Sequence, residues 1–194
     1  MRQVFLIVIL LIMMTRPAFA QNIKLPNVSG QFYDADPKKL ALDVNAYVQA
    51  ADVVPALEDV QIVIAPHAGY VYSGPVAGYS FKAVSQKNFK TIIILATSHY
   101  YGFDGASVWG KGGFQTPLGI VPVDEEFAQK LSALDAKFSF EPQAYQKEHS
   151  LEVQIPFLQK TFTDFKIVPL ILGQMSFANC QKLAASLNSL IADR

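Results

Sequence analysis

The fold is decided by residues 60–100, which read VQIVIAPHAGYVYSGPVAGYSFKAVSQKNFKTIIILATSHY. Each end of this stretch is a β-branched apolar run, at residues 60–64 and 91–95, and such runs are typical of buried parallel strands. Residues 74–84 lie between them and predict a helix that Pro75 opens. A strand, a helix and a second strand together predict a right-handed crossover unit of an α/β fold.

Helix and strand signals continue on both sides of this unit. Asp36 and Pro37 predict the start of a helix, and Asp124 predicts the N-cap of a later one. Residues 165–172 have the apolar content of another buried strand, although Pro169 favours a sheet edge or a strand end.

The remaining expected elements are shorter or less regular. They are short strands at 108–109 and 119–123, a helix over 149–163 that restarts near Pro156, and a final helix over 176–193. The run of glycines at 110–113 indicates a hairpin turn. We therefore expect a three-layer α/β/α sandwich with a mostly parallel central sheet, formed as a single domain over residues 21–194.

The first twenty residues have the parts of a secretory signal peptide. Arg2 is followed by an apolar run at 4–14 and then by the sequence PAFA, which predicts cleavage before Gln21. A membrane anchor is the alternative, but it needs about 20 apolar residues, and Arg16 interrupts the run. We expect an exported protein, periplasmic or secreted, that meets the membrane only through this peptide before cleavage.

Charge and cysteine content narrow the possible partners. The chain has 16 basic and 16 acidic residues, and loss of the signal peptide removes two arginines, which leaves a net charge of −2. This balance gives no electrostatic reason to expect nucleic acid as a partner. The single cysteine, Cys180, excludes an internal disulfide framework, and we expect it to be a buried structural thiol. A small molecule or a peptide is the expected ligand.

Two of the three histidines follow the two apolar runs. His67 and His99 therefore fall where ligands collect in open α/β sheets, just beyond the carboxyl ends of the strands. Two imidazoles at this edge can converge on one metal ion, and their nitrogen suits iron, copper, zinc and nickel alike. A histidine satisfied within the core is the alternative for each of them.

The third histidine, His149, follows a loop and is expected to begin a helix. A helix N-terminus disfavours protonated imidazole, which suits a residue that accepts a proton near neutral pH. Glu152, three residues later, is either a first-turn carboxylate of that helix or a part of the site. A serine hydrolase is not expected, because the sequence has no Gly-x-Ser-x-Gly elbow.

At these motifs the chain resembles the Memo family, the B component of the bacterial system named AmmeMemoRadiSam. The matching residues, in family order, are Gly30-Gln31-Phe32-Tyr33, Ala65-Pro66-His67-Ala68-Gly69-Tyr70, Tyr72-Ser73-Gly74, Ser98-His99, Thr116-Pro117-Leu118-Gly119, Glu148-His149-Ser150-Leu151-Glu152 and Val168-Pro169-Leu170. The resemblance implies a fold like that of class III extradiol dioxygenases, the non-haem iron enzymes that open catechol rings. It also implies a functional link to the Amme-type and radical SAM components of the same system.

The resemblance further implies roles for the three histidines. His67 and His99 would be metal ligands, with iron or copper as the candidate metals, and His149 would act beside the metal as acid–base or substrate contact. Family members continue beyond the last helix into a strand with a Ser-Ser-Asp motif that carries the remaining metal ligand. Nothing in this sequence after Arg194 supplies that strand, so the resemblance implies a C-terminally incomplete fold. The chain is then either a fragment of a longer gene product or a truncated copy with an incomplete site.

Three functions remain open from the sequence. The first is an exported Memo-like metalloprotein that carries out oxygen-dependent chemistry on an aromatic substrate. The second is a non-catalytic module that binds a peptide or small ligand in the same histidine cleft. The third is a metal-activated hydrolase, in which metal-bound water is the nucleophile.

Overall fold

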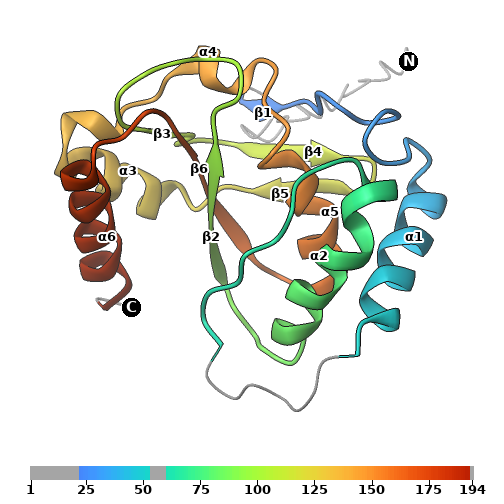
Figure 1. The fold of residues 1–194 in the computed structure, drawn as a ribbon. Coiled ribbons are helices and arrows are strands. Elements are labelled where there is room, and N and C mark those ends of the chain that lie inside the picture. The colour runs from blue at the N-terminus through green and yellow to red at the C-terminus, as the bar shows by residue number, and fades with distance from the viewer. Residues whose placement is uncertain (1–21, 53–59, 193–194) are drawn as a thin grey trace, which may run out of the picture.

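The computed structural model describes residues 22–52 and 60–192, which form a mixed α/β fold around two three-stranded sheets (Figure 1). In the first sheet β2 (Thr91–Thr97) pairs parallel with β6 (Lys166–Leu172), and β6 pairs antiparallel with β3 (Ala106–Val108). The second sheet has the order β1 (Ile23–Lys24), β4 (Gly113–Thr116) and β5 (Gly119–Pro122), and its last two strands form an antiparallel hairpin.

Helices lie on both sides of the β2–β6 pair. One side carries α1 (Pro37–Ala50), α2 (Tyr70–Val84) and α5 (Ile155–Thr161), and the other carries α3 (Glu125–Leu134) and α6 (Phe177–Ala192) (Figure 1). The short elements are α4 (Pro142–Tyr145) and the 3-10 turns η2 (Ala136–Phe138) and η3 (Glu152–Gln154). Helices on two sides of a sheet give the three-layer α/β arrangement that the sequence predicts.

Two predicted helix caps are confirmed. The Asp36 side chain accepts a hydrogen bond from the backbone N–H of Lys39, and Pro37 occupies the first turn of α1. Asp124 caps α3 in the same way, by accepting a bond from the N–H of Phe127. These caps satisfy backbone donors that the first turn of a helix leaves without an intrahelical partner.

The helix predicted to open at Pro75 begins five residues earlier, at Tyr70. Pro75 therefore lies inside α2, where it cannot donate to the carbonyl of Val71. Val71 is 78% exposed, so water can satisfy that carbonyl. The earlier start places His67 in the turn directly before the helix.

The predicted strand at residues 60–64 is wrong: described residues 60–68 have no regular secondary structure. Two of its apolar side chains point into solvent, Ile62 at 87% and Ile64 at 92% exposed, whereas Val60 packs against the core. A strand needs a neighbour to pair with its N–H and C=O groups, and no described strand pairs with this segment. Instead the Ser80 hydroxyl of α2 donates to the carbonyl of Ile64.

Pro169 was expected at an edge, but it lies in β6, the central strand of its sheet. Its carbonyl accepts a hydrogen bond from Trp109, one residue past the end of β3. An N–H at position 169 would bond to residue 109, which lies outside β3. Proline therefore costs no hydrogen bond between β6 and β3.

Two further expectations are corrected. The glycines at 110–113 do not form a hairpin turn, because β3 and β4 belong to different sheets and this segment connects them. The hairpin turn is at residues 116–119, between β4 and β5. Cys180 is exposed rather than buried, since it lies in the first turn of α6 and the buried stripe of that helix starts only at Leu183.

The expected signal peptide, residues 1–20, lies outside the described residues. Among the helices that the structure does describe, none is both long and apolar enough to cross a membrane.

Helices α1 and α2 approach each other closely, and this contact gives a stability prediction. A Cβ atom at Gly78 would lie 2.3 Å from the carbonyl oxygen of Tyr47 in α1. We expect Gly78→Ala to lower the free energy of unfolding by about 1–3 kcal/mol, because the two backbones must move apart. Urea denaturation measures this change. Gly110→Ala is the control, since its Cβ would meet open space, and an equal effect of both variants would contradict the close approach.

Candidate metal centre

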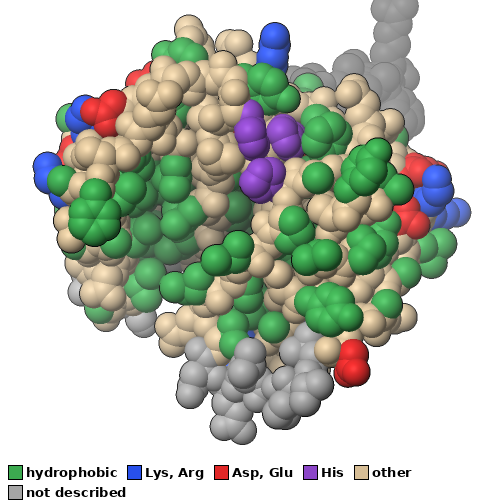
Figure 2. All heavy atoms as spheres, viewed as in Figure 1, with side chains coloured by type: hydrophobic (Ala, Val, Ile, Leu, Met, Phe, Trp, Pro, Cys, Tyr) green, Lys and Arg blue, Asp and Glu red, His purple; other side chains and the backbone are tan. Residues whose placement is uncertain are grey.

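The structure brings the three histidine rings to one place on the surface. His99 lies two residues past β2, His67 lies in the turn before α2, and His149 lies between α4 and η3. The ring centroid of His99 is 5.2 Å from that of His67 and 4.8 Å from that of His149, and His67 and His149 are 6.1 Å apart. Figure 2 shows the three side chains clustered on one face of the molecule.

The buried carboxylate of Glu148 holds this cluster in place through hydrogen bonds. Its Oε2 atom accepts a hydrogen bond from the backbone N–H of His99, at 2.7 Å, and its Oε1 atom lies 2.9 Å from the Nδ1 atom of the same residue. Oε1 also accepts bonds from the N–H groups of His149 and Ser150. A carboxylate only accepts, so Nδ1 of His99 carries the proton and Nε2 keeps its lone pair for a ligand.

These hydrogen bonds hold Glu148 in its charged form. Burial by itself would raise the pKa of this carboxyl group, but the bonds donated by His99 and Ser150 lower it to about 2. Atoms of His99, Glu148 and His149 that can bind a metal all lie within 4.8 Å of one another. Both oxygens of Glu148 are already used as acceptors, so we assign it to orienting His99 rather than to binding a metal directly.

His149 does not begin a helix, which corrects the expectation from the sequence. It precedes the single 3-10 turn η3, and α5 starts only at Ile155. Burial, rather than a helix dipole, lowers the pKa of His149, against the opposing charge of Glu148. Burial also lowers the pKa of His67, and the neighbouring His99 adds to this effect. Both rings are therefore neutral at pH 7, the form that binds a metal or accepts a proton.

The turn that carries His67 is tied to the segment that carries His149. The Gln154 side chain donates to the carbonyl of Pro66 at 3.2 Å, and the hydroxyl of the buried Tyr70 donates to the carbonyl of Val153 at 2.7 Å. Ser150 completes the connection, since its hydroxyl donates to the carbonyl of Thr97 at the end of β2. Hydrogen bonds to residues 150–154 thus fix the segments that carry the other two histidines.

Glu152 is buried, and its carboxylate supports the site without belonging to the histidine cluster. Its carboxylate accepts hydrogen bonds from the N–H groups of Asn27 and Val28 and from the hydroxyl of Tyr33. This holds the segment 27–33 against the site, with the Phe32 ring edge-on to His149 at 4.7 Å. Glu152 therefore positions a wall of the site and does not itself reach the cluster.

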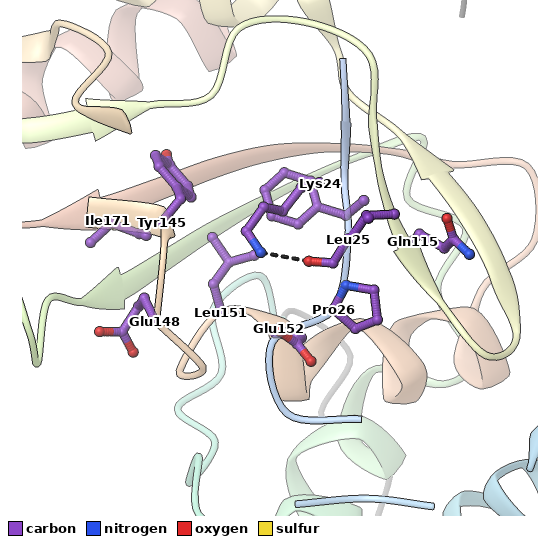
Figure 3. A pocket seen from close by; sticks show the side chains of 10 residues that line it. Lys24, Leu25, Pro26, Gln115, Tyr145, Glu148, Leu151, Glu152 and Ile171 are labelled. Carbon is purple, nitrogen blue, oxygen red and sulfur yellow. Dashed lines mark hydrogen bonds between the residues drawn. The ribbon is translucent and has the colours of Figure 1, made fainter. Parts of the chain in front are cut away.

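A small cavity lies behind the two carboxylates. Figure 3 shows Glu148 and Glu152 at its wall, with Lys24 donating to the carbonyl of Leu25. The space of about 10 Å³ suffices for about one water molecule. It is too small for an organic ligand.

A larger hollow opens beside His99, at the carboxyl ends of β2 and β6. It measures about 280 Å³. The lining residues are Thr97, Ser98, His99, Tyr100, Tyr101, Gly102, Leu172, Gly173 and Gln174. This is the edge of a parallel sheet at which α/β proteins bind their ligands, and its size approaches that of small-molecule pockets, about 300 Å³ and above.

The donor set fits a transition metal. His99 and His149 belong with Glu148 to a group of potential ligands within 4.8 Å, and His67 lies outside this group, although its ring centroid is 5.2 Å from that of His99. A carboxylate orients His99 in the manner typical of metal-bound histidine. The Nδ1 atom of His149 is buried and has no hydrogen-bond partner among the described residues, since Glu148 Oε1 is 3.7 Å away. An unpaired buried nitrogen is a group that a ligand or a transferred proton would satisfy.

Comparison with known proteins places this site in a family. The family model described as "Memo-like protein" matches residues 24–194. The chain belongs to the Memo family. It is 39% identical over 159 residues to a MEMO1 family protein of Nitrosopumilus maritimus, a match that covers 79% of this chain and 58% of that protein. Similar proteins from Saccharolobus solfataricus (37% identity, 77% of this chain, 56% of the relative) and Sulfolobus acidocaldarius (35%, 88%, 64%) also carry this family name.

The chain spans about three fifths of the length of these Memo relatives. The family fold is like that of the extradiol dioxygenases, in agreement with the α/β architecture described above. The motifs that first indicated Memo include all three histidines and Glu148.

Sequence reasoning missed three residues that build the site. Glu148 was seen only as a neighbour of His149, yet it bonds His99, which is 49 positions away. Gln154 and Phe32 were not singled out for a role at the site. Only the occurrence of Glu148 and Phe32 within Memo motifs signalled their importance. A contact between residues that are far apart in the sequence produces no regular spacing that could predict it.

The depressed pKa of Glu148 predicts a specific dependence of stability on pH. We expect Glu148→Gln to lower the free energy of unfolding by about 2–3 kcal/mol at pH 7, because an amide cannot accept all four bonds. A carboxyl whose folded pKa is lowered stabilises the fold above its unfolded pKa, which is 4.5. This contribution is lost as the pH falls from 4.5 towards 2. Urea unfolding at several pH values should therefore show the variant and wild type converging.

The exposed Glu126, paired with Lys130 on α3, provides the control. Glu126→Gln should change stability by less than about 0.5 kcal/mol at either pH. A difference between wild type and Glu148→Gln that stays constant down to pH 2.5 would contradict the role assigned to Glu148.

Proposed function

We propose that this protein is an exported Memo-like metalloprotein in which His67 and His99 bind iron or copper and His149 transfers protons. The substrate would be an aromatic or phenolic compound, and the chemistry would depend on dioxygen. The observation that carries the proposal is the meeting of the three imidazoles at the end of β2, with the His67 and His99 rings 5.2 Å apart.

Each residue of the site contributes a distinct property to this function. Glu148 holds the proton on Nδ1 of His99 and thereby directs Nε2 toward a ligand. Iron or copper, when bound, would supply the redox chemistry with dioxygen and a charge that orients the substrate. His149 is neutral near pH 7 and would accept the proton of a phenolic hydroxyl at a ring nitrogen. The hollow beside His99 would hold the aromatic ring next to Tyr100 and Tyr101.

Metal binding by purified protein tests the proposal. Iron(II) or copper(II) is titrated under defined conditions, and bound metal is measured by elemental analysis after desalting. We expect about one metal ion per chain, and we expect His67→Ala and His99→Ala each to weaken binding by at least about 10-fold. His149→Ala should retain metal more fully than either of them.

Gln146→Ala changes an exposed side chain two positions before Glu148 in the sequence and serves as the control. Unchanged metal affinity in both His67→Ala and His99→Ala would remove the proposal. Zinc binding with ester or amide hydrolysis would instead favour the hydrolase, and ligand binding without metal would favour the binding module.

Export forms part of the same proposal and rests on the sequence of residues 1–20 alone. We expect a bacterial host that expresses the whole chain to yield periplasmic or secreted protein whose N-terminus is Gln21. Fractionation and mass spectrometry of the N-terminal peptide measure this outcome. Intact protein that begins at Met1 and stays with the cytoplasmic fraction would contradict export.

A further inference from the structure

Asn27, three residues past β1, is bonded to the segment that carries Glu148. Its side-chain amide donates hydrogen bonds to the carbonyl of Tyr145, at 3.1 Å, and to the carbonyl of Glu148, at 2.9 Å. Its backbone N–H donates to the carboxylate of Glu152 at 2.6 Å. One residue therefore holds three positions of the segment 145–152, which lie 118 to 125 positions away along the chain.

Lys24 fixes which way the Asn27 amide faces. Its ammonium group donates to Oδ1 of Asn27 at 2.9 Å and to the carbonyl of Leu25 at 2.5 Å (Figure 3). An ammonium group only donates and a backbone carbonyl only accepts. The amide oxygen therefore faces Lys24, and the two hydrogens on Nδ2 serve the two carbonyls. The reversed amide would leave all three partners without a bond.

The two carbonyls bracket the turn that precedes His149. Tyr145 is the last residue of α4, and Glu148 follows three residues later. Both residues are buried, with Tyr145 3% and Glu148 4% exposed. A buried carbonyl that loses its donor destabilises the conformation that buries it. The amide of Asn27 therefore holds the backbone of this turn in one position.

Glu148 connects this amide to the histidine cluster. Its carbonyl is held by Asn27, whereas its carboxylate bonds both the backbone N–H and the Nδ1 atom of His99. Hydrogen bonds weaken steeply as their geometry departs from the optimum, and a close-packed interior leaves the side chain little room to compensate for a displaced backbone. Movement of the turn would therefore release the Nδ1 proton of His99.

We propose that Asn27 is a positioning residue of the histidine site. Its amide holds the backbone of Glu148 where the carboxylate keeps the proton of His99 on Nδ1. This inference rests on the proposed function in one respect, since Nε2 of His99, which this tautomer leaves without a proton, is the nitrogen that would bind the metal. Loss of the amide should change the tautomer of His99 in protein that is still folded.

Nitrogen-15 NMR of the metal-free protein tests this role. Couplings between ring nitrogens and carbon-bound ring protons show which nitrogen carries the proton, and the spectrum of His99→Ala identifies the signals. At pH 8.5, where free imidazole is neutral, we expect His99 of the wild type to carry its proton on Nδ1. Asn27→Asp keeps the size of the side chain but cannot donate, so the ratio of the Nδ1–H to the Nε2–H form should fall by at least about 10-fold.

Asn27→Ala removes both donors without adding a charge and should have the same effect. Because Asn27 is only partly buried, this variant decides the test if Asn27→Asp does not fold. Asn188→Asp is the matched control, since it makes the same chemical change at an exposed position of α6. It should leave the tautomer of His99 as in the wild type.

Three results would overturn the proposal. They are a Nδ1 proton that His99 keeps in the folded Asn27 variants, a wild type that already carries this proton on Nε2, and an equal shift in Asn188→Asp. Metal binding is measured separately on His67→Ala and His99→Ala. If the wild type binds no metal, the proposed function fails while the NMR result still decides the role of Asn27. An unchanged tautomer removes that role and leaves the proposed metal binding standing.

Discussion

The geometry of the histidine site depends on the carboxylate of Glu148, because it accepts hydrogen bonds from His99, His149 and Ser150 at the same time. Those donors come from the end of β2 and from the segment after α4, which the sequence separates widely. A buried carboxylate is costly unless such bonds satisfy it, so the two segments and the charge stabilise one another. His67 is joined to them through Gln154 and Tyr70, which tie its turn to the same segment.

This arrangement gives the three imidazoles different properties although they lie together. His99 is the most exposed and has its proton fixed by Glu148, so a lone pair is available to a ligand from solvent. His149 is buried against Phe32 and keeps one ring nitrogen without a hydrogen-bond partner. A ligand-binding imidazole beside a neutral, proton-accepting one is the combination that metal-assisted acid–base chemistry requires. The hollow at the ends of β2 and β6 lies directly next to it.

Local signals predicted much of the fold. The caps Asp36 and Asp124 and the final helix depend on neighbours within one helix, and the structure confirms them. Residues 60–64 show where local reasoning fails, because a strand also depends on pairing with a partner elsewhere in the fold, and no described strand pairs with them. The prediction for Pro169 is wrong for the same reason. A proline fits this central strand only because β3 ends before the position that would need its N–H.

The three histidines of the site were predictable from the sequence, and the residues that hold them in place were not. The histidines stand out because they are few and follow apolar runs, whereas the reach of Glu148 to His99 and of Glu152 to Asn27 spans 49 and 125 positions. The pairing of β2 could not be foreseen either. It depends on the strand order, in which β6 rather than residues 60–64 lies beside β2.

Electron paramagnetic resonance of the copper(II)-loaded protein tests most directly whether the imidazoles form one metal centre. Nitrogen couplings report how many imidazoles bind the ion. At least two nitrogen ligands are predicted for the wild type, with one fewer in His67→Ala and in His99→Ala. A spectrum that neither substitution changes would show that the histidines meet without sharing a metal.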